Sequence, residues 1–250
     1  MTYCLGIKVK EGLVAISDTR ITSGTDVTVK KKLFTLQKDG CSLFIMTSGL
    51  RSVRDKAITY FSELLEEQFD SYNKLYKAVN AFGEQVKRVA EEDREALEKA
   101  GFKFNLNTII GGQLKDDEEP KLFLLYPEGN WVEFGEGAPY VIIGNAAQGK
   151  AILNRVLNDD TNLHLCLKAG FLSFDSTRIS AADVDFPIDI VLYERDSFQL
   201  IEHRYTKSDL QDISAHWDEE LKTALKNIPN DWMDVAFSKL NSNNITPLEE

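Results

Sequence analysis

The sequence predicts an α+β fold, a four-layer αββα sandwich in which two antiparallel sheets lie face to face with helices on both outer sides. Three observations predict it. Apolar residues alternate with period two over most of residues 1–49, and the apolar period lengthens to that of a helix over residues 51–101. Strands, two helices and strands then follow before residue 205. This order is typical of two sheets that bury one face on each other and cover the other face with helices.

The first element is a hairpin over residues 1–18, broken by KEG near its centre. Gly12, the last residue of that break, predicts a three-residue loop, because glycine readily takes the left-handed conformation that such a loop needs. The loop pairs Val9 with Leu13. In that register Thr2 and Asp18 lie on the same face as diagonal neighbours, about 5–8 Å apart. The hairpin thus brings the start of the chain close to an aspartate.

The later elements follow in order along the chain. Two strands are expected on either side of Asp39-Gly40, at KKLFTL and CSLFIMTSG, and then helices from about Arg51 to Phe69 and from Leu75 toward Gly101. Strands return at FNLNTIIGGQL, KLFLLYP, WVEFGEG and YVIIG, helices at GKAILNRVL and LHLCLKAGFLSF, and a last hairpin at IDIVLYERD and FQLIEHRY. The helix LHLCLKAGFLSF is apolar nearly all round and is therefore expected to be buried.

The end of the chain differs from the rest in composition. From Ser208 on it is acidic, with a helical pattern through Trp217, Leu221 and Leu225. The residues before it contain no repeat, linker or low-complexity stretch. We therefore expect one domain over residues 1–207 and an acidic C-terminal helical extension over residues 208–250.

Composition narrows the classes of function. With 29 basic and 40 acidic residues the net charge is −11, which argues against nucleic acid or an anionic membrane as a partner. The cysteines lack paired spacing, the scattered histidines form no metal-ligand pattern, and neither a leader nor a long apolar run is present. These features predict a cytoplasmic protein without a metal or other cofactor.

Thr2 is the first candidate for chemistry. A threonine at the head of a chain can use its own α-amine as the base that activates its hydroxyl, because the pKa of that amine lies near about 7.7–8.0. Thr2 meets this condition once Met1 is removed, and removal is expected because threonine is small. Many proteins begin with Met-Thr, so the dipeptide alone carries little weight.

The neighbours of Thr2 add to the hypothesis. A hydroxyl nucleophile needs a positive group nearby and an acid that holds that group in place. Asp18 supplies the acid, and Lys32, the last lysine before an apolar strand, is the one expected to point inward. In TSGLR the backbone N–H of Gly49 lies at a helix N-terminus, where it can face a developing oxyanion. Taken singly, the lysine run is typical of a solvated loop and the glycine of a capped turn.

The stretches TYCLGIKVKEGLVAISDTRITSG, KKLF and TSGL closely resemble the N-terminal half of proteasome β-type subunits. Within that superfamily the chain looks most like the bacterial branch called Anbu, the ancestral β-subunit, which also begins Met-Thr-Tyr-Cys. The motifs are specific over residues 1–50, and the order of elements agrees to about residue 205. The resemblance implies the N-terminal nucleophile hydrolase fold and a threonine peptidase.

The resemblance also assigns catalytic roles. The nucleophile of the family falls on Thr2, its aspartate on Asp18, its lysine on Lys32 and its oxyanion glycine on Gly49. An aspartate that holds the threonine amine falls on Asp175.

Substrate-binding roles follow from the motif D-x-R-x-T-x-G, which stands here as DTRITSG and contributes Arg20, Ile21 and Thr22. The backbone of Thr22 would pair with an extended peptide by strand addition. Ile21 and Thr47 would line the pocket for the residue before the cut. These side chains predict a pocket of moderate size without strong charge, and hence a preference for apolar residues.

The second half of the chain departs from the family pattern. Gly144-Asn145-Ala146 stands where β-subunits have Gly-Ser-Gly beside the threonine amine. Arg178 stands where a serine follows Asp175 by three residues. Without these serines, proton transfer is in question and the activity is expected to be low or unusual.

Three alternatives remain open at the level of the sequence. GNAAQGKA fits a phosphate loop, but Ala151 cannot bind Mg²⁺, and the segment is better explained as a helix start whose small residues pack closely on a sheet. A different N-terminal nucleophile amidase, acting on a small amide, would use the same Thr2. A non-catalytic assembly subunit is the third, although such a subunit would not need Thr2, Asp18 and Lys32 together.

The resemblance finally implies partners. The expected substrate is a peptide or a small amide, and the expected assembly is a homo-oligomer in the form of a ring, a lock-washer or a helical stack. Chains of this type pack head to tail, which permits either a closed or an open assembly.

Overall fold

The computed structural model describes residues 2–23, 26–38, 40–68 and 71–242. The chain divides into two compact units, Met1–Lys207 and Ser208–Glu250. The first unit holds both antiparallel sheets, and the predicted fold class is confirmed.

The sheet that contains the start of the chain has its strands in the order β10-β1-β2-β11-β12, all antiparallel. We call it the N-terminal sheet. Its strands are β1 Tyr3–Val9, β2 Gly12–Asp18, β10 Tyr140–Gly144, β11 Ile188–Glu194 and β12 Leu200–Tyr205. Every residue of β1 and β2 is buried, as expected for central strands covered on both faces.

The second sheet has the order β5-β6-β7-β8-β9 and is also antiparallel. Its strands are β5 Leu33–Lys38, β6 Cys41–Gly49, β7 Leu106–Gln113, β8 Lys121–Leu125 and β9 Trp131–Phe134. The sequence predicted each of these strands.

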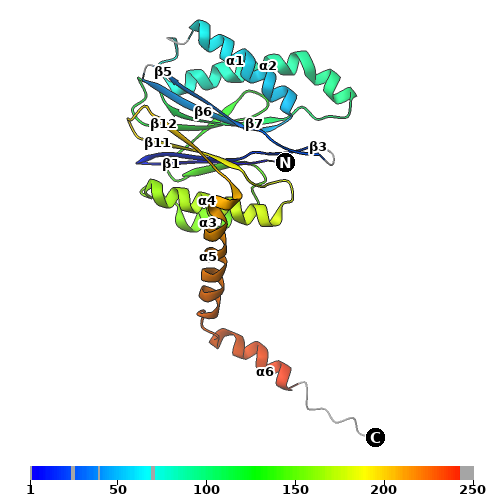
Figure 1. Cartoon of the computed structure of the whole chain (residues 1–250), viewed down its shortest axis with the longest axis vertical. Coiled ribbons are helices and arrows are strands. Elements are labelled where there is room, and N and C mark those ends of the chain that lie inside the picture. Colours follow the sequence, from blue (N-terminus) through cyan, green and yellow to red (C-terminus); the bar gives the residue numbers. More distant parts are fainter. Residues whose placement is uncertain (1, 24–25, 39, 69–70, 243–250) are drawn as a thin grey trace. The chain divides into compact units, whose positions relative to one another are not determined.

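Two helices cover the outer face of each sheet (Figure 1). Helices α1 (Arg51–Gln68) and α2 (Leu75–Lys99) lie on the second sheet, and α3 (Lys150–Val156) and α4 (Leu163–Ser180) lie on the N-terminal sheet. The helix boundaries agree with the prediction to within a few residues, except that α4 runs to Ser180. Phe69, the predicted end of the first helix, and Asp39 of the predicted turn lie outside the described residues.

Apolar contacts on both sides hold β1 in place. Between the two sheets, Cys4 belongs to a buried cluster with Phe44 and Met46. On the other side, Gly170 of α4 lies so close to the sheet that a Cβ there would be 2.7 Å from Cδ1 of Ile16. Because both faces of the N-terminal sheet are packed, the position of the first residue of β1 is well defined.

The register of the first hairpin differs from the prediction. Val9 pairs with Gly12, so the loop has two residues, and the predicted pairing of Val9 with Leu13 is wrong by one residue. The glycine serves another purpose. Its φ is +152°, and a Cβ there would lie 2.0 Å from the carbonyl oxygen of Tyr193 on β11. Gly12 therefore permits the close approach of β11 rather than a three-residue loop.

A short two-stranded ribbon was not predicted. It consists of β3 (Arg20–Ser23) and β4 (Asp26–Val29), paired antiparallel, and it follows β2 directly. Its strands, RITS and DVTV, are four residues long and only partly apolar, so they give a weak periodic signal.

Helix α4 is only partly buried, which corrects the prediction made from its apolar composition. Leu165 and Ile179 are 42% and 66% exposed, whereas Phe174 on the opposite side is fully buried. An apolar composition on all sides therefore did not require burial on all sides.

The second unit is helical. It contains α5 (Lys207–Lys226), whose first residue belongs to the first unit, a short 3-10 helix at Asp231–Met233, and α6 (Asp234–Ser242). Within the described residues, none of the helices has the length and apolar character that crossing a membrane requires.

Candidate active site

Thr2 lies directly before β1 and is 9% exposed. Its carbonyl oxygen accepts a hydrogen bond of 2.7 Å from the backbone N–H of Asn145. The preceding residue, Gly144, has φ +86°, and a Cβ there would lie 1.9 Å from the same carbonyl oxygen. Glycine is therefore required for β10 to approach the start of β1 this closely. The end of β10 thus fixes the backbone of Thr2.

Asp18, the last residue of β2, is hydrogen-bonded to the start of β1. Its Oδ1 accepts one hydrogen bond of 2.8 Å from the backbone N–H of Tyr3 and another of 2.8 Å from Nζ of Lys32. The Lys32 and Asp18 side chains are 4% and 0% exposed. The N–H of Tyr3 belongs to the peptide bond that joins it to Thr2. The buried ion pair is therefore linked directly to the backbone of the predicted nucleophile.

This contact forms although the predicted register was wrong. The ladder between β1 and β2 ends at the pair Cys4 and Ser17, so the N–H of Tyr3 has no carbonyl partner on β2. The carboxylate of Asp18 takes that place. Asp18 does lie close to the start of the chain. The predicted placement of Thr2 and Asp18 on the same face is wrong, because in the observed register Asp18 falls opposite Tyr3, and the contact runs through the main chain of Tyr3.

Burial raises the pKa of the Asp18 carboxyl to about 6, and the ammonium of Lys32 and the N–H of Tyr3 oppose this rise. With its pKa at about 6, the Asp18 carboxyl titrates nearer to neutral pH than an ordinary aspartate. Such groups are concentrated at functional sites, although structural ion pairs show the same property.

Asp175 of α4 is buried and is bound by Arg178 one helical turn later. Nε and Nη2 of Arg178 donate to Oδ1 of Asp175 at 3.0 and 2.6 Å. The arginine that replaces the serine of the family pattern therefore forms an ion pair with the aspartate assigned to the amine. On the same helix, Ser173 accepts a hydrogen bond of 2.7 Å from the hydroxyl of Tyr3. This contact ties α4 to the start of β1.

Gly49 is the last residue of β6, and α1 begins two residues later, at Arg51. Its φ is +145°, and a Cβ there would lie 2.1 Å from the carbonyl oxygen of Asn105. Glycine is therefore needed at this position for the approach of the segment before β7. Its predicted oxyanion role remains a prediction.

The three motif residues after Thr19 lie on β3. Arg20 donates from Nη1 to Oδ2 of Asp185 at 3.1 Å, Ile21 is partly buried, and the backbone of Thr22 pairs with Val27 of β4. Arg20 is thus held by the segment before β11, and one edge of β3 is occupied by β4.

A pocket of about 290 Å³ opens beside Lys32 and Thr47, between β5, β6 and α1. We call it the Thr47 pocket. Thr47 lines it as predicted, whereas Ile21 is not among the described residues that line it. The expectation of a pocket without strong charge does not describe this pocket, whose lining includes five charged side chains: Lys30, Lys31, Lys32, Arg54 and Asp55.

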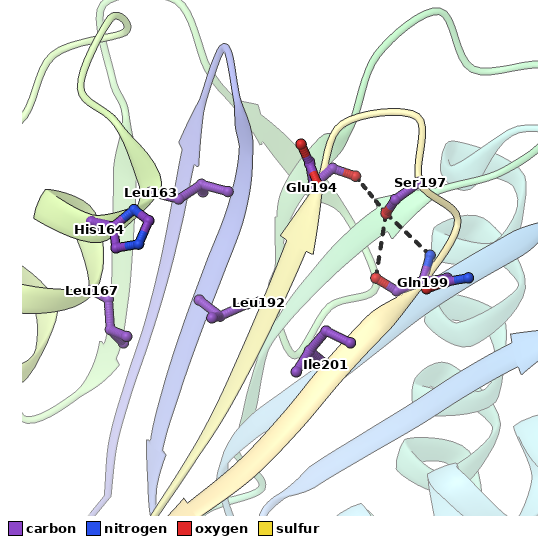
Figure 2. Close-up of a pocket in the computed structure, with 8 residues that line it drawn as sticks. All are labelled: Leu163, His164, Leu167, Leu192, Glu194, Ser197, Gln199 and Ile201. Atoms are coloured by element: carbon purple, nitrogen blue, oxygen red, sulfur yellow. Dashed lines mark hydrogen bonds between the residues drawn. The ribbon is translucent and has the colours of Figure 1, made fainter.

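A second pocket, of about 340 Å³, lies between α4 and the hairpin of β11 and β12 (Figure 2). Its walls are mainly apolar, with Leu163, Leu192 and Ile201 among them. The hydroxyl of Ser197 donates to the carbonyl oxygen of Glu194 at 2.7 Å. None of the predicted site residues lines this pocket, and it offers no activated nucleophile.

The candidate phosphate loop and the thiol of Cys4 are both explained by packing. In GNAAQGKA, a Cβ on Gly149 would lie 2.1 Å from Oγ of Ser173, so this glycine permits α3 to pack on α4 rather than on a sheet. Cys4 is fully buried, and burial raises the pKa of its thiol to about 12. A thiol with so high a pKa is not a reactive nucleophile at neutral pH.

Sequence reasoning missed several partners of the site. It did not find Asp185, which holds Arg20, or Lys30, Arg54 and Asp55, which give the Thr47 pocket its charge. Asp55 follows Arg51 by four residues on α1, and this spacing was a readable signal for an ion pair. The spatial meeting of Lys30 with Asp55 had no such signal, because it joins two separate elements.

Comparison with known proteins identifies the family. A sequence model described as Proteasome subunit matches residues 2–176. The chain belongs to the proteasome subunit family. Among curated proteins, no sequence matches it.

Solved structures of Anbu proteins are similar over nearly the whole chain. An Anbu (Gly-1) mutant from Hyphomicrobium sp. strain MC1 is 32% identical with a TM-score of 0.84, covering 91% of this chain and 99% of that chain. Anbu, the ancestral β-subunit, from Yersinia bercovieri is 30% identical with a TM-score of 0.83, covering 91% and 98%. The Anbu complex from Pseudomonas aeruginosa, a helical assembly, is 28% identical with a TM-score of 0.82, covering 91% and 97%. The predicted closeness to Anbu is confirmed.

Proposed function

We propose that this proteasome-type subunit is a threonine hydrolase of the N-terminal nucleophile class, which cleaves peptide or small amide bonds with Thr2 after Met1 has been removed. Met1 lies outside the described residues. The observation that carries the proposal is the buried pair of Lys32 and Asp18. Asp18 accepts a hydrogen bond from the N–H of Tyr3, the first residue of β1.

The energetics of that pair support a chemical role. Burying a lysine and an aspartate costs each its hydration, and a buried pair often contributes less to stability than apolar residues of similar size. A fold that keeps Lys32 at 4% exposure beside the start of a strand gains little stability from it. In the proposal, the role of the pair is to supply a fixed positive charge close to Thr2, to which it is linked through the N–H of Tyr3.

The reaction follows from these positions. The free α-amine of Thr2 accepts the proton of its own hydroxyl, and the oxygen attacks the substrate carbonyl. The charge of Lys32 favours the oxygen anion during the attack, and the N–H of Gly49 donates to the oxyanion of the tetrahedral intermediate. The amine returns its proton to the leaving group. Water then hydrolyses the ester on Thr2 and regenerates the enzyme.

Substrate is bound in extended form. In the proposed geometry the backbone of Thr22 on β3 pairs with the peptide, and Ile21 and Arg20 flank it. The side chain before the cut enters the Thr47 pocket, which Lys32 also lines. Asp175 holds the α-amine of Thr2. Because Arg178 already occupies one oxygen of Asp175, the activity is expected to be modest.

The ion pair of Arg178 with Asp175 also favours a second candidate function, an assembly subunit with little or no catalysis. In either case we propose a homo-oligomer, since a relative forms a helical assembly of the Anbu complex. The domain boundary after residue 207 is part of the same proposal, with residues 208–250 as a C-terminal extension of the catalytic domain.

Covalent labelling distinguishes the two functions. Protein that begins at Thr2 is incubated with a β-lactone, which acylates activated hydroxyl groups, and the modified residue is found by peptide mass spectrometry. We expect a single acyl adduct on Thr2, loss of the adduct in Thr2→Ala, and its return in the matched variant Thr2→Ser. A protein without an adduct on residue 2, although folded, would support the assembly subunit.

A further inference from the structure

The Thr47 pocket contains more positive charge than its single carboxylate balances. Asp55 is contacted by three cations: Nη2 of Arg54 lies 2.6 Å from Oδ1, Nε of Arg51 lies 3.3 Å from Oδ2, and Nζ of Lys30 lies 3.7 Å from Oδ2. Lys32 and Lys31 add two more charges to the lining, paired with Asp18 and Glu202 respectively. Around Asp55, one negative charge therefore faces three positive charges.

These cations are positioned to bind a ligand. The side chain of Arg54 is only 12% exposed, and Lys30 is 43% exposed. A partly buried guanidinium is less well hydrated than one on the surface, so a carboxylate that reaches it gains strong charge-assisted hydrogen bonds. The apolar wall, with Phe34 and Ile58, lowers the local polarity and strengthens such contacts.

The pocket adjoins the proposed catalytic centre. Lys32 both lines it and donates to Asp18, which in turn accepts from the N–H of Tyr3. Thr47 also lines the pocket and lies on β6 two residues before Gly49. A side chain that enters the pocket is therefore next to the lysine of the proposed catalytic pair. Its volume of about 290 Å³ lies near the lower end of the range for small-ligand sites, about 300–1,000 Å³.

We infer that the Thr47 pocket selects an acidic side chain, glutamate or aspartate, at the substrate residue before the cut, with Arg54 and Lys30 as the residues that determine this specificity. The inference rests on the proposed function for the direction of the substrate. It replaces the apolar preference expected from Ile21 and Thr47 alone. A substrate with lysine before the cut would bring a positive charge close to Lys30 and Arg54, and we expect it to bind poorly.

Binding to the inactive protein tests the inference without turnover. Four fluorescein-labelled, N-blocked peptides that differ only at the residue before the scissile bond (Glu, Gln, Leu or Lys) are titrated against Thr2→Ala protein, and fluorescence anisotropy gives Kd. We expect Glu to bind about tenfold more tightly than its neutral isostere Gln, because one partly buried charged hydrogen bond is gained. The advantage should shrink in high salt.

A charge reversal shows which residue is responsible. Lys30→Glu, in the Thr2→Ala background, should abolish the preference for Glu and improve binding of the Lys peptide. Arg54→Gln should reduce the preference for Glu without favouring Lys. Lys10→Glu is the matched control, since Lys10 is 69% exposed at the opposite end of β1 and carries the same change of charge. Circular dichroism confirms that each variant is folded, and Lys30→Gln replaces Lys30→Glu if the latter is not.

The outcomes separate this inference from the proposed function. A preference for Leu, equal binding of all four peptides or no binding in the millimolar range would overturn the acidic pocket, even if the β-lactone labels Thr2. A Glu preference that Lys30→Glu removes, found in a protein that the β-lactone does not label, would support the pocket and reject the hydrolase.

Discussion

Two carboxylates on neighbouring strands of the N-terminal sheet form ion pairs in different surroundings. Asp18 of β2 and Asp189 of β11 are adjacent in the ladder, where Asp18 pairs with Ile188 and Asp189 with Ser17. Asp189 faces Arg204 directly across the strands β11 and β12, and the arginine donates to both of its oxygens at 2.6 and 2.9 Å. Asp18 binds a single lysine nitrogen and a backbone N–H through one oxygen.

The difference lies in hydration. The Asp189 side chain is 7% exposed, but Arg204 is 45% exposed, so the arginine keeps much of its water while the pair stabilises the ladder like other cross-strand pairs. Lys32 is 4% exposed, so its pair with Asp18 loses hydration that a stable fold would not need to lose. Ion pairs of the same chemistry can thus be assigned to structure or to function by what their burial costs. The following predictions test that comparison.

The largest difference is expected in activity. Asp18→Asn keeps the shape of the side chain but removes the charge that pairs with Lys32. We expect kcat/KM for a peptide amide to fall by about 10²–10⁴-fold, the range typical of lost electrostatic or acid–base assistance. Asp189→Asn, the matched control, should change it less than about threefold. Equal losses in the two variants would mean that Asp18 is only structural.

The second prediction concerns pH. Protonation of the Thr2 amine, with a pKa of about 7.7–8.0, gives log(kcat/KM) a slope of one below that pH. Because burial raises the pKa of Asp18 to about 6, a second proton should steepen the slope to about two below pH 6. The Asp189→Asn variant should show both slopes of log(kcat/KM) against pH. A slope of one down to pH 5 would show that the charge of Asp18 is not needed.

The free energy of unfolding is expected to depend on pH in the opposite direction from kcat/KM. In the unfolded chain the pKa of an aspartate is about 3.9, so between about pH 4 and pH 6 the folded state binds the Asp18 proton more strongly. The contribution of Asp18 to the free energy of unfolding should therefore fall as the pH rises through this window. Urea unfolding of the wild type at several pH values measures it, with Asp18→Asn as the reference that lacks this group.

The free energy of unfolding should also differ between the two ion pairs when one partner, or both, is removed. Lys32→Met leaves Asp18 buried without its cation and should lower the free energy of unfolding by about 3 kcal/mol. The double variant Asp18→Asn with Lys32→Met should recover most of this loss, but no activity. Removal of Arg204 should cost less than removal of Lys32, because water can reach the position of the half-exposed arginine and hydrate Asp189. A double variant as unstable as Lys32→Met would indicate that the pair stabilises the fold.

The smallest effect is expected at Arg178. Arg178→Ser restores the residue of the family pattern and makes Oδ1 of Asp175 available to the amine of Thr2. We expect kcat/KM to rise about threefold, the equivalent of part of one hydrogen bond. Arg155→Ser on α3 is the control, since Arg155 is exposed and bonds only the carbonyl oxygen of Ala151 among the described contacts. A fall in kcat/KM would give Arg178 a positive role.

The sequence predicted the layers, the order of elements and the meeting of Asp18 with Lys32, because these depend on local periodicity and on a specific motif. It did not predict the hairpin register, because Gly12 can serve either a turn or the approach of β11, and only the three-dimensional structure distinguishes the two. The charge of the Thr47 pocket was missed for a similar reason. Lys30 and Arg54 lie on separate elements and meet only at Asp55.

The central claim is that Thr2 acts through its own amine. The most direct test compares β-lactone acylation of protein that begins at Thr2, released from a cleavable fusion, with protein that retains Met1, each confirmed by intact mass. With Met1 attached, the nitrogen of Thr2 is an amide and cannot act as a base. We predict that acylation of Thr2 is about 10²–10⁴-fold slower in that protein, with folding unchanged. Equal acylation rates of the two proteins would contradict the account.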